Sequence, residues 1–252
     1  MDFQNQILGS WCEKENYLRI VSLVPSITEF IMDLGLENEL VGVTKFCVHP
    51  SHLIKKKIKV GGTKKLNINK IKSLKPDLIL ANKEENVKVQ IEELANFCPV
   101  YLTDVNSFEQ GLEMIKRLGK LLNKSNVAHA IAEEIDGKFE SLNIGNNRRF
   151  LYFIWNEPKY LAGQNTFICS LMEKIGFKNA CESSRYPEWK NEDAEIIFLS
   201  SEPFPFKKKH IAEFQSLFPN AEIRLIDGEM CSWYGSRMLQ SADYFRNFNL
   251  EF

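Results

Sequence analysis

The chain has almost no net charge, no long hydrophobic run and no clustered cysteines. Its 32 basic and 33 acidic residues balance, so no global field attracts nucleic acid or anionic lipid, and we expect neither partner. No stretch approaches the roughly 18 apolar residues of a membrane-spanning helix, so we expect no membrane insertion. The 6 cysteines contain no Cys-x-x-Cys pair, which predicts free thiols rather than a zinc site or a disulfide framework.

Common catalytic motifs are also absent from the sequence. There is no Gly-x-Ser-x-Gly, no Gly-x-Gly-x-x-Gly, no phosphate-binding loop and no His-Glu-x-x-His. We therefore predict no catalytic residues, no enzymatic activity and no required cofactor. An enzyme stays an alternative, because a catalytic triad can assemble from distant positions.

The first fifteen residues do not resemble a secretion signal. They contain Asp2, Glu13 and Glu15 and no unbroken apolar block. Cys12 follows Trp11, where a lipid attachment site has a small residue. We expect a cytoplasmic protein, or a periplasmic one if the given start omits a signal.

The rest of the chain alternates β-branched apolar runs with helical patterns, as in an α/β protein. We predict two Rossmann-like lobes with parallel central sheets, over residues 1–105 and 144–252, and a helical connection over 106–143. The predicted strands lie near 19–24, 40–44, 77–81, 99–102, 149–155, 195–199 and 222–226. The predicted helices of the lobes lie near 28–34, 68–74, 87–96, 166–175, 208–217 and 234–247.

The connection consists of two helical patterns, near 108–122 and about 125–142. The second carries apolar residues at steps of three and four, which define one buried face. Ser125 can begin this helix, and Asn143 with Gly145 can end it. We expect a single rigid inter-lobe helix that holds the lobes at a nearly fixed angle, unlike a flexible glycine-rich linker.

Residues 19–29 turn abruptly from a strand into a helix at Pro25. Ser26 and Glu29 have the Ser-x-x-Glu spacing of a reciprocal helix cap. Ligands of α/β sheets bind beyond the carboxyl ends of the strands. Pro25, Ser26 and Thr28 are therefore candidate ligand-binding residues, and an ordinary βα turn is the alternative.

Five motifs, in this order, resemble the helical-backbone (class III) substrate-binding proteins of ABC importers for cobalamin, haem and ferric siderophores. The cobalamin-binding branch is the most similar. The resemblance runs from about residue 19 to 248. The motifs are RIVSLVPSITE at 19–29, VGVT at 41–44 followed by FCVHP at 46–50, VGGT at 60–63, LKPDLIL at 74–80 and SWYGSR at 232–237.

The resemblance implies a monomeric, non-catalytic binding protein that holds its ligand between the lobes. The implied ligand is a corrinoid such as cobalamin, with haem or a ferric siderophore as the alternative, and the implied partner is an ABC importer permease. A cytoplasmic sensor or scavenger uncoupled from transport is a further alternative. The implied ligand-binding residues are Pro25, Ser26, Thr28, Phe46, His49, Gly62, Thr63, Trp155, Arg185, Tyr186, Glu202, Trp233 and Tyr234.

Aromatic residues are concentrated in the predicted rim loops and can line an apolar slot for a flat macrocycle. Phe204, Phe206 and Trp189 belong either to this slot or to the core of the second lobe. The Gly61-Gly62 pair permits a tight turn and a close backbone approach. Arg237 either clamps an anionic group of the ligand or pairs with a nearby acid such as Asp227 or Glu229.

One segment brings soft and imidazole metal ligands together. In an extended chain Cys47 and His49 point to the same side. His49 is the candidate metal ligand, acting on cobalt or iron inside a bound macrocycle, and a hydrogen-bonded loop histidine is the alternative.

The chain departs from the family where relatives dock on a permease. They use one surface glutamate on each lobe, and the first of these positions is Asn69 here. The second falls in a shortened region, where Glu188 or Glu192 is the candidate substitute. Ligand binding without transport coupling therefore stays an alternative.

Overall fold

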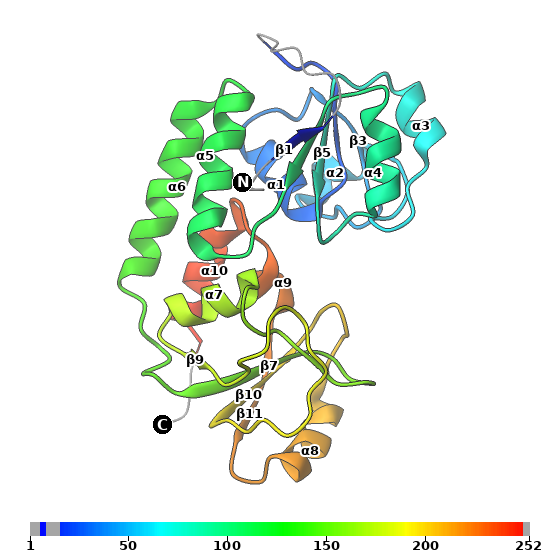
Figure 1. Cartoon of the computed structure of the whole chain (residues 1–252). Helices are drawn as coiled ribbons and strands as arrows, with labels where there is room; N and C mark the ends of the chain where they lie inside the picture. Colours follow the sequence, from blue (N-terminus) through cyan, green and yellow to red (C-terminus); the bar gives the residue numbers. More distant parts are fainter. Residues whose placement is uncertain (1–5, 9–15, 249–252) are drawn as a thin grey trace. The chain divides into compact units, whose positions relative to one another are not determined.

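The computed structural model describes residues 6–8 and 16–248. The chain divides into two compact units, each discontinuous in sequence, and Figure 1 labels their elements. Unit 1 comprises Met1–Val105, Leu112–Ala132 and Gly235–Arg237, and unit 2 comprises Asn106–Gly111, Glu133–Tyr234 and Met238–Phe252. Within the described part of the chain, no helix combines the length and the apolar character needed to cross a membrane. Most of the amino-terminal segment, including Cys12, lies outside the described residues.

Unit 1 contains a six-stranded sheet in the order β1-β6-β5-β2-β3-β4. All its strand pairs are parallel except β1 with β6. The strands are β1 (Gln6–Leu8), β2 (Ile20–Ser22), β3 (Leu40–Val43), β4 (Ile58–Lys59), β5 (Leu78–Asn82) and β6 (Val100–Thr103). The parallel α/β lobe predicted from the sequence is confirmed, and the short edge strands β1 and β4 are additions to it.

The helices predicted for unit 1 are present in the predicted order, with one short helix added after β3. They are α1 (Pro25–Asp33), α2 (Ser51–Ile54), α3 (Ile68–Ser73) and α4 (Lys88–Ala95), together with most of α5 (Phe108–Leu121) and the first half of α6 (Ser125–Glu140). Alternate strand residues such as Val21 and Ile79 pack against Ile71 of α3 and Ile91 of α4. Every residue of β2 and β5 is buried, so both faces of the sheet are covered, as is usual for a parallel sheet.

The predicted cap of α1 is wrong. The helix begins at Pro25, with Val24 as its N-cap residue and no side-chain cap hydrogen bond. Proline fixes φ and lacks an N–H, so it is favoured at the first helical position, where that donor would be unpaired. Ser26 therefore lies inside the first turn, and the Glu29 carboxylate instead contacts Arg237.

Unit 2 contains a five-stranded sheet with the path β11-β10-β7-β8, and β9 also pairs with β7. Strands β7, β9, β10 and β11 are parallel, and β8 is antiparallel to β7. The strands are β7 (Arg149–Trp155), β8 (Tyr160–Leu161), β9 (Lys178–Asn179), β10 (Ile196–Ser200) and β11 (Glu222–Ile226). The second predicted α/β lobe is thus confirmed.

The helices of unit 2 are α7 (Phe167–Lys174), α8 (Lys208–Leu217), α9 (Gly228–Ser232) and α10 (Arg237–Arg246). The helix predicted over residues 234–247 begins at Arg237, three residues later than predicted. The short helix α9 precedes it. Trp233 lies between α9 and α10 in an extended conformation. An aromatic cluster fills the core under α8, where Phe153 contacts Phe214 at 4.8 Å and Phe218 at 5.9 Å between ring centroids.

Helices α5 and α6 match the two predicted connecting helices. Gly119 permits their close approach within unit 1, because a Cβ there would lie 2.1 Å from the Cβ of Ala128. The predicted apolar stripe on α6 is buried at Ala128, Ile135 and Phe139. The division between the units falls within α6, after Ala132. The fixed angle between the lobes stays a prediction.

Candidate functional site

The carboxyl edge of the unit 1 sheet carries the candidate residues of that unit. Strand order reverses around β2, because β3 pairs with one of its edges and β5 with the other. Such a reversal leaves a crevice beyond the strand ends, where ligands of α/β proteins bind. The start of α1, directly after β2, supplies Pro25 and Ser26. The loops after β3 and β4 supply Phe46 and His49, and Gly62 and Thr63, respectively.

Asn86 joins the loops at this edge. Its side-chain amide donates to the carbonyl of Thr63 at 3.1 Å and to that of Leu23 at 3.5 Å, and its Oδ1 accepts from the backbone N–H of Asn82 at 2.9 Å. Asn86 is buried, and its three hydrogen bonds connect the segment after β2, the loop after β4 and the end of β5. Asn86 is not among the residues predicted from the sequence, although its place in a loop directly after a buried strand is a local signal of such a role.

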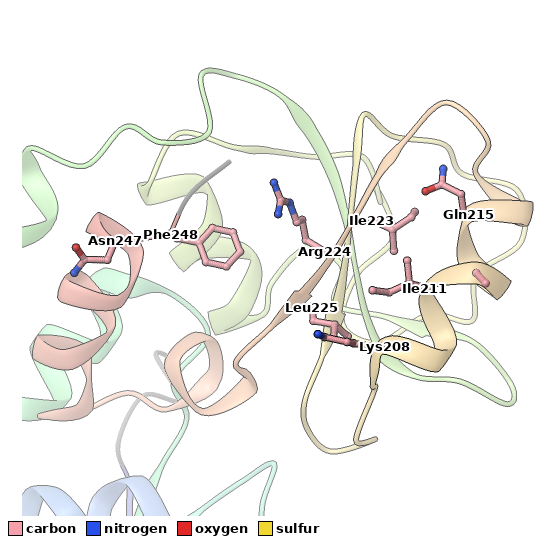
Figure 2. A pocket seen from close by; sticks show the side chains of 9 residues that line it. Lys208, Ile211, Gln215, Ile223, Arg224, Leu225, Asn247 and Phe248 are labelled. Carbon is pink, nitrogen blue, oxygen red and sulfur yellow. The ribbon is translucent and has the colours of Figure 1, made fainter. Parts of the chain in front are cut away.

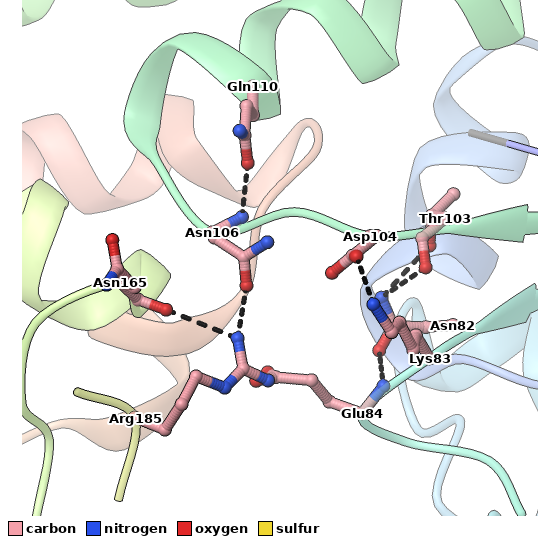
Figure 3. A network of polar contacts seen from close by, with 9 residues as sticks. All are labelled: Asn82, Lys83, Glu84, Thr103, Asp104, Asn106, Gln110, Asn165 and Arg185. Atoms are coloured by element: carbon pink, nitrogen blue, oxygen red, sulfur yellow. Dashed lines mark hydrogen bonds and ion pairs between the residues drawn. The ribbon is translucent and has the colours of Figure 1, made fainter. Parts of the chain in front are cut away.

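The end of β5 is tied to the end of β6 by a second polar network (Figure 3). Asn82 donates through Nδ2 to the Thr103 hydroxyl at 3.1 Å, and its Oδ1 accepts from the backbone N–H of Glu84 at 2.8 Å. Lys83 pairs with Asp104 at 2.8 Å. These contacts fix the backbone of the loop after β5.

Thr28 is not available to a ligand. Its side chain is fully buried, and its hydroxyl lies 2.8 Å from both the Val24 carbonyl and the Ser22 hydroxyl. Pro25 and Ser26 are also buried, within the first turn of α1. The sequence places these residues correctly after β2, but packing of α1 on the sheet turns the Thr28 side chain inward.

Phe46 is the exposed aromatic residue of the unit 1 edge, with half of its surface accessible (50%). Its ring stands beside Gly62, where a Cβ would lie 3.2 Å from Cε2 of Phe46 and 3.3 Å from Cε of Lys45. The Lys45 ammonium lies 5.0 Å from the centre of the Phe46 ring. Gly62 thus lets the aromatic ring rest near the backbone, which explains why glycine suits this position.

Gly61 and Thr63 complete a tight turn after β4. Gly61 has a φ of +114° and bridges to Leu66, and the Gly62 N–H donates to the Lys65 carbonyl at 2.9 Å. A Cβ on Gly61 would lie 2.5 Å from that carbonyl oxygen. Thr63 is buried next to this turn.

Cys47 and His49 do not form a common metal-binding pair. Cys47 is buried, and its Sγ lies 3.1 Å from the Thr28 hydroxyl and 3.2 Å from that of Thr44. Burial raises the pKa of the Cys47 thiol, which disfavours the thiolate. His49 is half-buried, and no group of three or more potential metal-ligating side chains occurs among residues 6–8 and 16–248. Coordination by His49 stays a prediction.

Unit 2 presents its candidates at the carboxyl edge of its own sheet. The register pairs Phe153 with Leu199 and Ser200 with Ile226, so β7, β10 and β11 end at one level. Trp155, Glu202 and Trp233 lie at or just beyond these three ends. Strand order reverses at β7, and ligands of α/β proteins bind beyond the strand ends at such a reversal.

Trp155 ends β7 and is 41% exposed. Its Nε1 donates to the Glu157 carbonyl at 3.1 Å, and its ring makes an edge contact with Phe204 at 5.7 Å between centroids. Phe204 is partly buried against the core, whereas Phe206 lies within it. Trp189 is likewise partly buried against this core, and its ring lies 5.2 Å from that of Phe218.

Glu202 and Trp233 meet directly. The Trp233 indole N–H donates to Oε1 of Glu202 at 3.0 Å, and the Ser232 hydroxyl lies 3.1 Å from the same oxygen. Trp233 is half-buried. Its neighbour Tyr234 is buried against Phe167, with 5.7 Å between ring centroids. Tyr234 therefore packs in the interior of unit 2, and Trp233 is the accessible aromatic residue of the pair.

Arg185 and Tyr186 form a separate pair in unit 2, and Figure 3 shows Arg185 beside Asn106 and Asn165. Nη1 of Arg185 donates to Oδ1 of Asn106 and, at 3.2 Å, to the carbonyl of Asn165. The guanidinium also lies 5.8 Å from the centre of the Tyr186 ring, and Tyr186 is 36% exposed. Asn106 orients Arg185, and the sequence analysis does not identify that role.

Arg237 does not act as a free clamp for an anion. It is buried and pairs with Glu29, an acid that neither expected role involves. The sequence favours local acids because they lie within ten positions. The fold instead brings an acid from the other end of the chain.

A pocket of about 760 Å³ lies on unit 2 between α8, β11 and the end of α10 (Figure 2). None of the candidate ligand-binding residues lines it. Its walls are mixed, with apolar, amide and cationic side chains from Lys208, Ile211, Ala212, Gln215, Ile223, Arg224, Leu225, Asn247 and Phe248. The pocket therefore does not coincide with the candidate site at the carboxyl edge.

Curated proteins share part of the sequence. An uncharacterised ABC transporter substrate-binding lipoprotein of Bacillus subtilis is 28% identical over 180 residues, which cover 66% of this chain and 56% of that protein. A vitamin B12-binding protein of Pectobacterium carotovorum is 27% identical over 177 residues, which cover 67% of this chain and 63% of that protein. The chain thus spans less than two thirds of the length of these relatives.

Solved structures share the fold. The periplasmic vitamin B12-binding protein of Vibrio cholerae superposes with a TM-score of 0.76 at 20% identity, covering 91% of this chain and 95% of the other. The periplasmic haem-binding protein of Roseiflexus sp. RS-1 gives a TM-score of 0.74 at 19% identity, and the match covers 90% of this chain and 96% of the other. The sequence model of the family described as periplasmic binding protein matches residues 20–203. With most of its length matched and the same α/β fold, this chain belongs to the periplasmic binding protein family.

Proposed function

We propose that the chain binds a corrinoid such as cobalamin and does not transform it. The observation that carries this proposal is the presence of accessible aromatic rings at the carboxyl edges of both sheets, Phe46 in unit 1 and Trp155 and Trp233 in unit 2. Flat, rigid macrocycles gain buried area against such rings at a low entropic cost. The vitamin B12-binding relatives support the corrinoid class. The position of the ligand between the lobes stays a prediction.

Haem or a ferric siderophore is the second candidate ligand. The haem-binding structural neighbour favours haem, because the fold carries that ligand elsewhere. His49 is a half-buried imidazole at the unit 1 edge and can supply an axial ligand to haem iron or to cobalt. A His49→Ala substitution that weakens haem binding and leaves corrinoid binding unchanged would favour haem as the ligand.

Calorimetry with cyanocobalamin and with haem tests the proposal. We expect binding at micromolar concentration or tighter, and Trp155→Ala and Trp233→Ala each to weaken it by roughly 1–3 kcal/mol, as for central aromatic anchors. Leu217→Ala is the matched control, because Leu217 is a 42% exposed apolar residue of unit 2 on α8. Flat titrations with both ligands would reject the proposal.

Recovery of the bound compound tests the non-catalytic part of the proposal. Family membership supports binding without chemistry, since the relatives carry substrate-binding names. After long incubation, mass spectrometry should return the corrinoid unaltered. A changed ligand mass would establish an enzyme instead.

We also propose that the protein works outside the cytoplasmic membrane and delivers its ligand to an ABC importer permease. The lipoprotein relative and the periplasmic neighbour support this location, whereas they give the cytoplasmic expectation no support. Asn69 is exposed on α3 and Glu188 is exposed in unit 2, but the Glu192 carboxylate accepts from two backbone N–H groups. Glu188 is therefore the better candidate docking residue. Loss of permease co-purification in Glu188→Gln, with ligand affinity retained, tests this role.

A further inference from the structure

The Glu202 carboxylate is held next to the Trp233 indole by hydrogen bonds. Oε1 accepts the indole N–H at 3.0 Å, and the Ser232 hydroxyl approaches the same oxygen at 3.1 Å. A charged acceptor makes a stronger hydrogen bond to an indole N–H than a neutral one does. The hydrogen bond to Glu202 therefore restricts rotation of the Trp233 ring about its side-chain torsions.

The backbone that carries Glu202 is held as well. The Ser200 hydroxyl donates to the Glu202 carbonyl at 2.6 Å and accepts from the Glu202 N–H at 3.3 Å, and the buried Tyr152 hydroxyl donates to Ser200 at 3.0 Å. These three residues join the middle of β7 to the end of β10 and the turn that follows it. The turn after β10 thus has little freedom to move.

Gly228 gives Glu202 the space that it needs. A Cβ at Gly228 would lie 2.4 Å from Cγ of Glu202 and 2.9 Å from its backbone nitrogen. The Gly228 N–H also donates to the Ser201 hydroxyl at 2.9 Å. The turn after β10 and the start of α9 therefore pack directly on each other, and α9 leads to Trp233, five residues after Gly228.

We propose that Glu202 is a positioning residue, which sets the orientation of the Trp233 ring and acts on the ligand through that ring. The inference rests on the proposed function, in which Trp233 is an aromatic contact. A ring that is already oriented loses less conformational entropy when the ligand stacks on it. The sequence resemblance predicts direct ligand contact for Glu202, whereas its carboxylate accepts the Trp233 indole N–H.

The indole N–H resonance of Trp233 in a ¹⁵N-labelled sample tests the positioning directly, and Trp233→Phe assigns that resonance. In Glu202→Leu, which removes the acceptor, we expect the resonance to move upfield and its hydrogen exchange to accelerate at least tenfold. Glu202→Gln keeps an acceptor oxygen and should restore most of the protection. Glu133→Leu removes an exposed carboxylate of α6 in the same unit and should leave the resonance unchanged.

Affinity for cyanocobalamin or haem then separates positioning from direct contact. Glu202→Leu should weaken binding roughly tenfold, and in the Trp233→Phe background the same change should have almost no further effect. An unchanged indole resonance in Glu202→Leu, or a full additional tenfold loss in the Trp233→Phe background, overturns the proposal. If the wild type binds neither ligand, the proposed function fails, and the resonance alone decides whether Glu202 orients Trp233.

Discussion

Glu29 and Arg237, 208 positions apart in the sequence, form a buried bidentate ion pair in unit 1. Nε of Arg237 lies 2.8 Å from Oε2 of Glu29, and Nη2 lies 2.8 Å from Oε1. Both side chains are less than a tenth exposed. The pair attaches residues 235–237 to α1, so the final part of the chain contributes to the unit that the first part builds.

Breaking this ion pair should destabilise the protein strongly. Arg237→Met leaves a buried carboxyl without its partner, and we expect a loss of roughly 3–5 kcal/mol in the free energy of unfolding, measured by urea denaturation. The double variant Glu29→Leu/Arg237→Met should lose less than either single variant, because no buried charge is left alone. A double variant as unstable as the sum of the singles would contradict this account.

Alanine substitutions of the adjacent residues Gly61 and Gly62, at the carboxyl edge of the unit 1 sheet, should have different effects on stability. Gly61→Ala places a Cβ 2.5 Å from a backbone oxygen at a positive φ, so we expect a loss of about 1–3 kcal/mol in stability. Gly62→Ala meets only the Phe46 and Lys45 side chains, which can shift. It should leave the melting temperature nearly unchanged and weaken ligand binding by displacing the Phe46 ring. Equal melting temperatures for the two variants would refute the distinction.

The described cysteines should react slowly in the folded protein. Cys47, Cys98, Cys169, Cys181 and Cys231 are all buried free thiols. Burial raises the pKa of Cys47 and Cys181, and that of Cys169 to about 12, so the reactive thiolate is scarce at pH 8. In a Cys12→Ser background, a thiol reagent at pH 8 should label fewer than one site per folded chain and all five after denaturation. Rapid labelling of Cys47, located by mass spectrometry, would show that its loop opens.

Glu213 should contribute a pH-dependent part of the stability. A hydrogen bond from Lys159, at 2.6 Å, lowers the pKa of Glu213 below its ordinary value of 4.5. A carboxyl group with a lowered folded-state pKa stabilises the protein above its unfolded-state pKa, and this contribution disappears as the pH falls through the folded-state value. The wild type should therefore melt above Glu213→Gln at pH 7, and the difference should shrink below pH 4.5.

Exposed Glu133 gives the control for this experiment. Glu133→Gln should melt close to the wild type at every pH, because its carboxylate lies on the exposed side of α6. A difference between wild type and Glu213→Gln that stays constant from pH 7 to pH 3 would show that the Lys159 contact does not depend on the charge of Glu213.

The sequence by itself determined the α/β class, the order of the main strands and helices, and the loops in which the candidate residues lie. Local patterns suffice for this, because strand and helix periods and the residues after each strand are properties of neighbouring positions. Pro25, Phe46, Trp155 and Trp233 were placed at or beyond strand ends on these grounds, and the structure has them there.

Only the tertiary structure decided which side chains meet. Thr28 and Cys47 are buried in contact with each other, Glu29 pairs with Arg237 rather than capping α1, and Glu202 holds the Trp233 indole. Each of these contacts joins residues that are separated by a strand, a helix or most of the chain. Their energies depend on packing and burial, which no local spacing encodes.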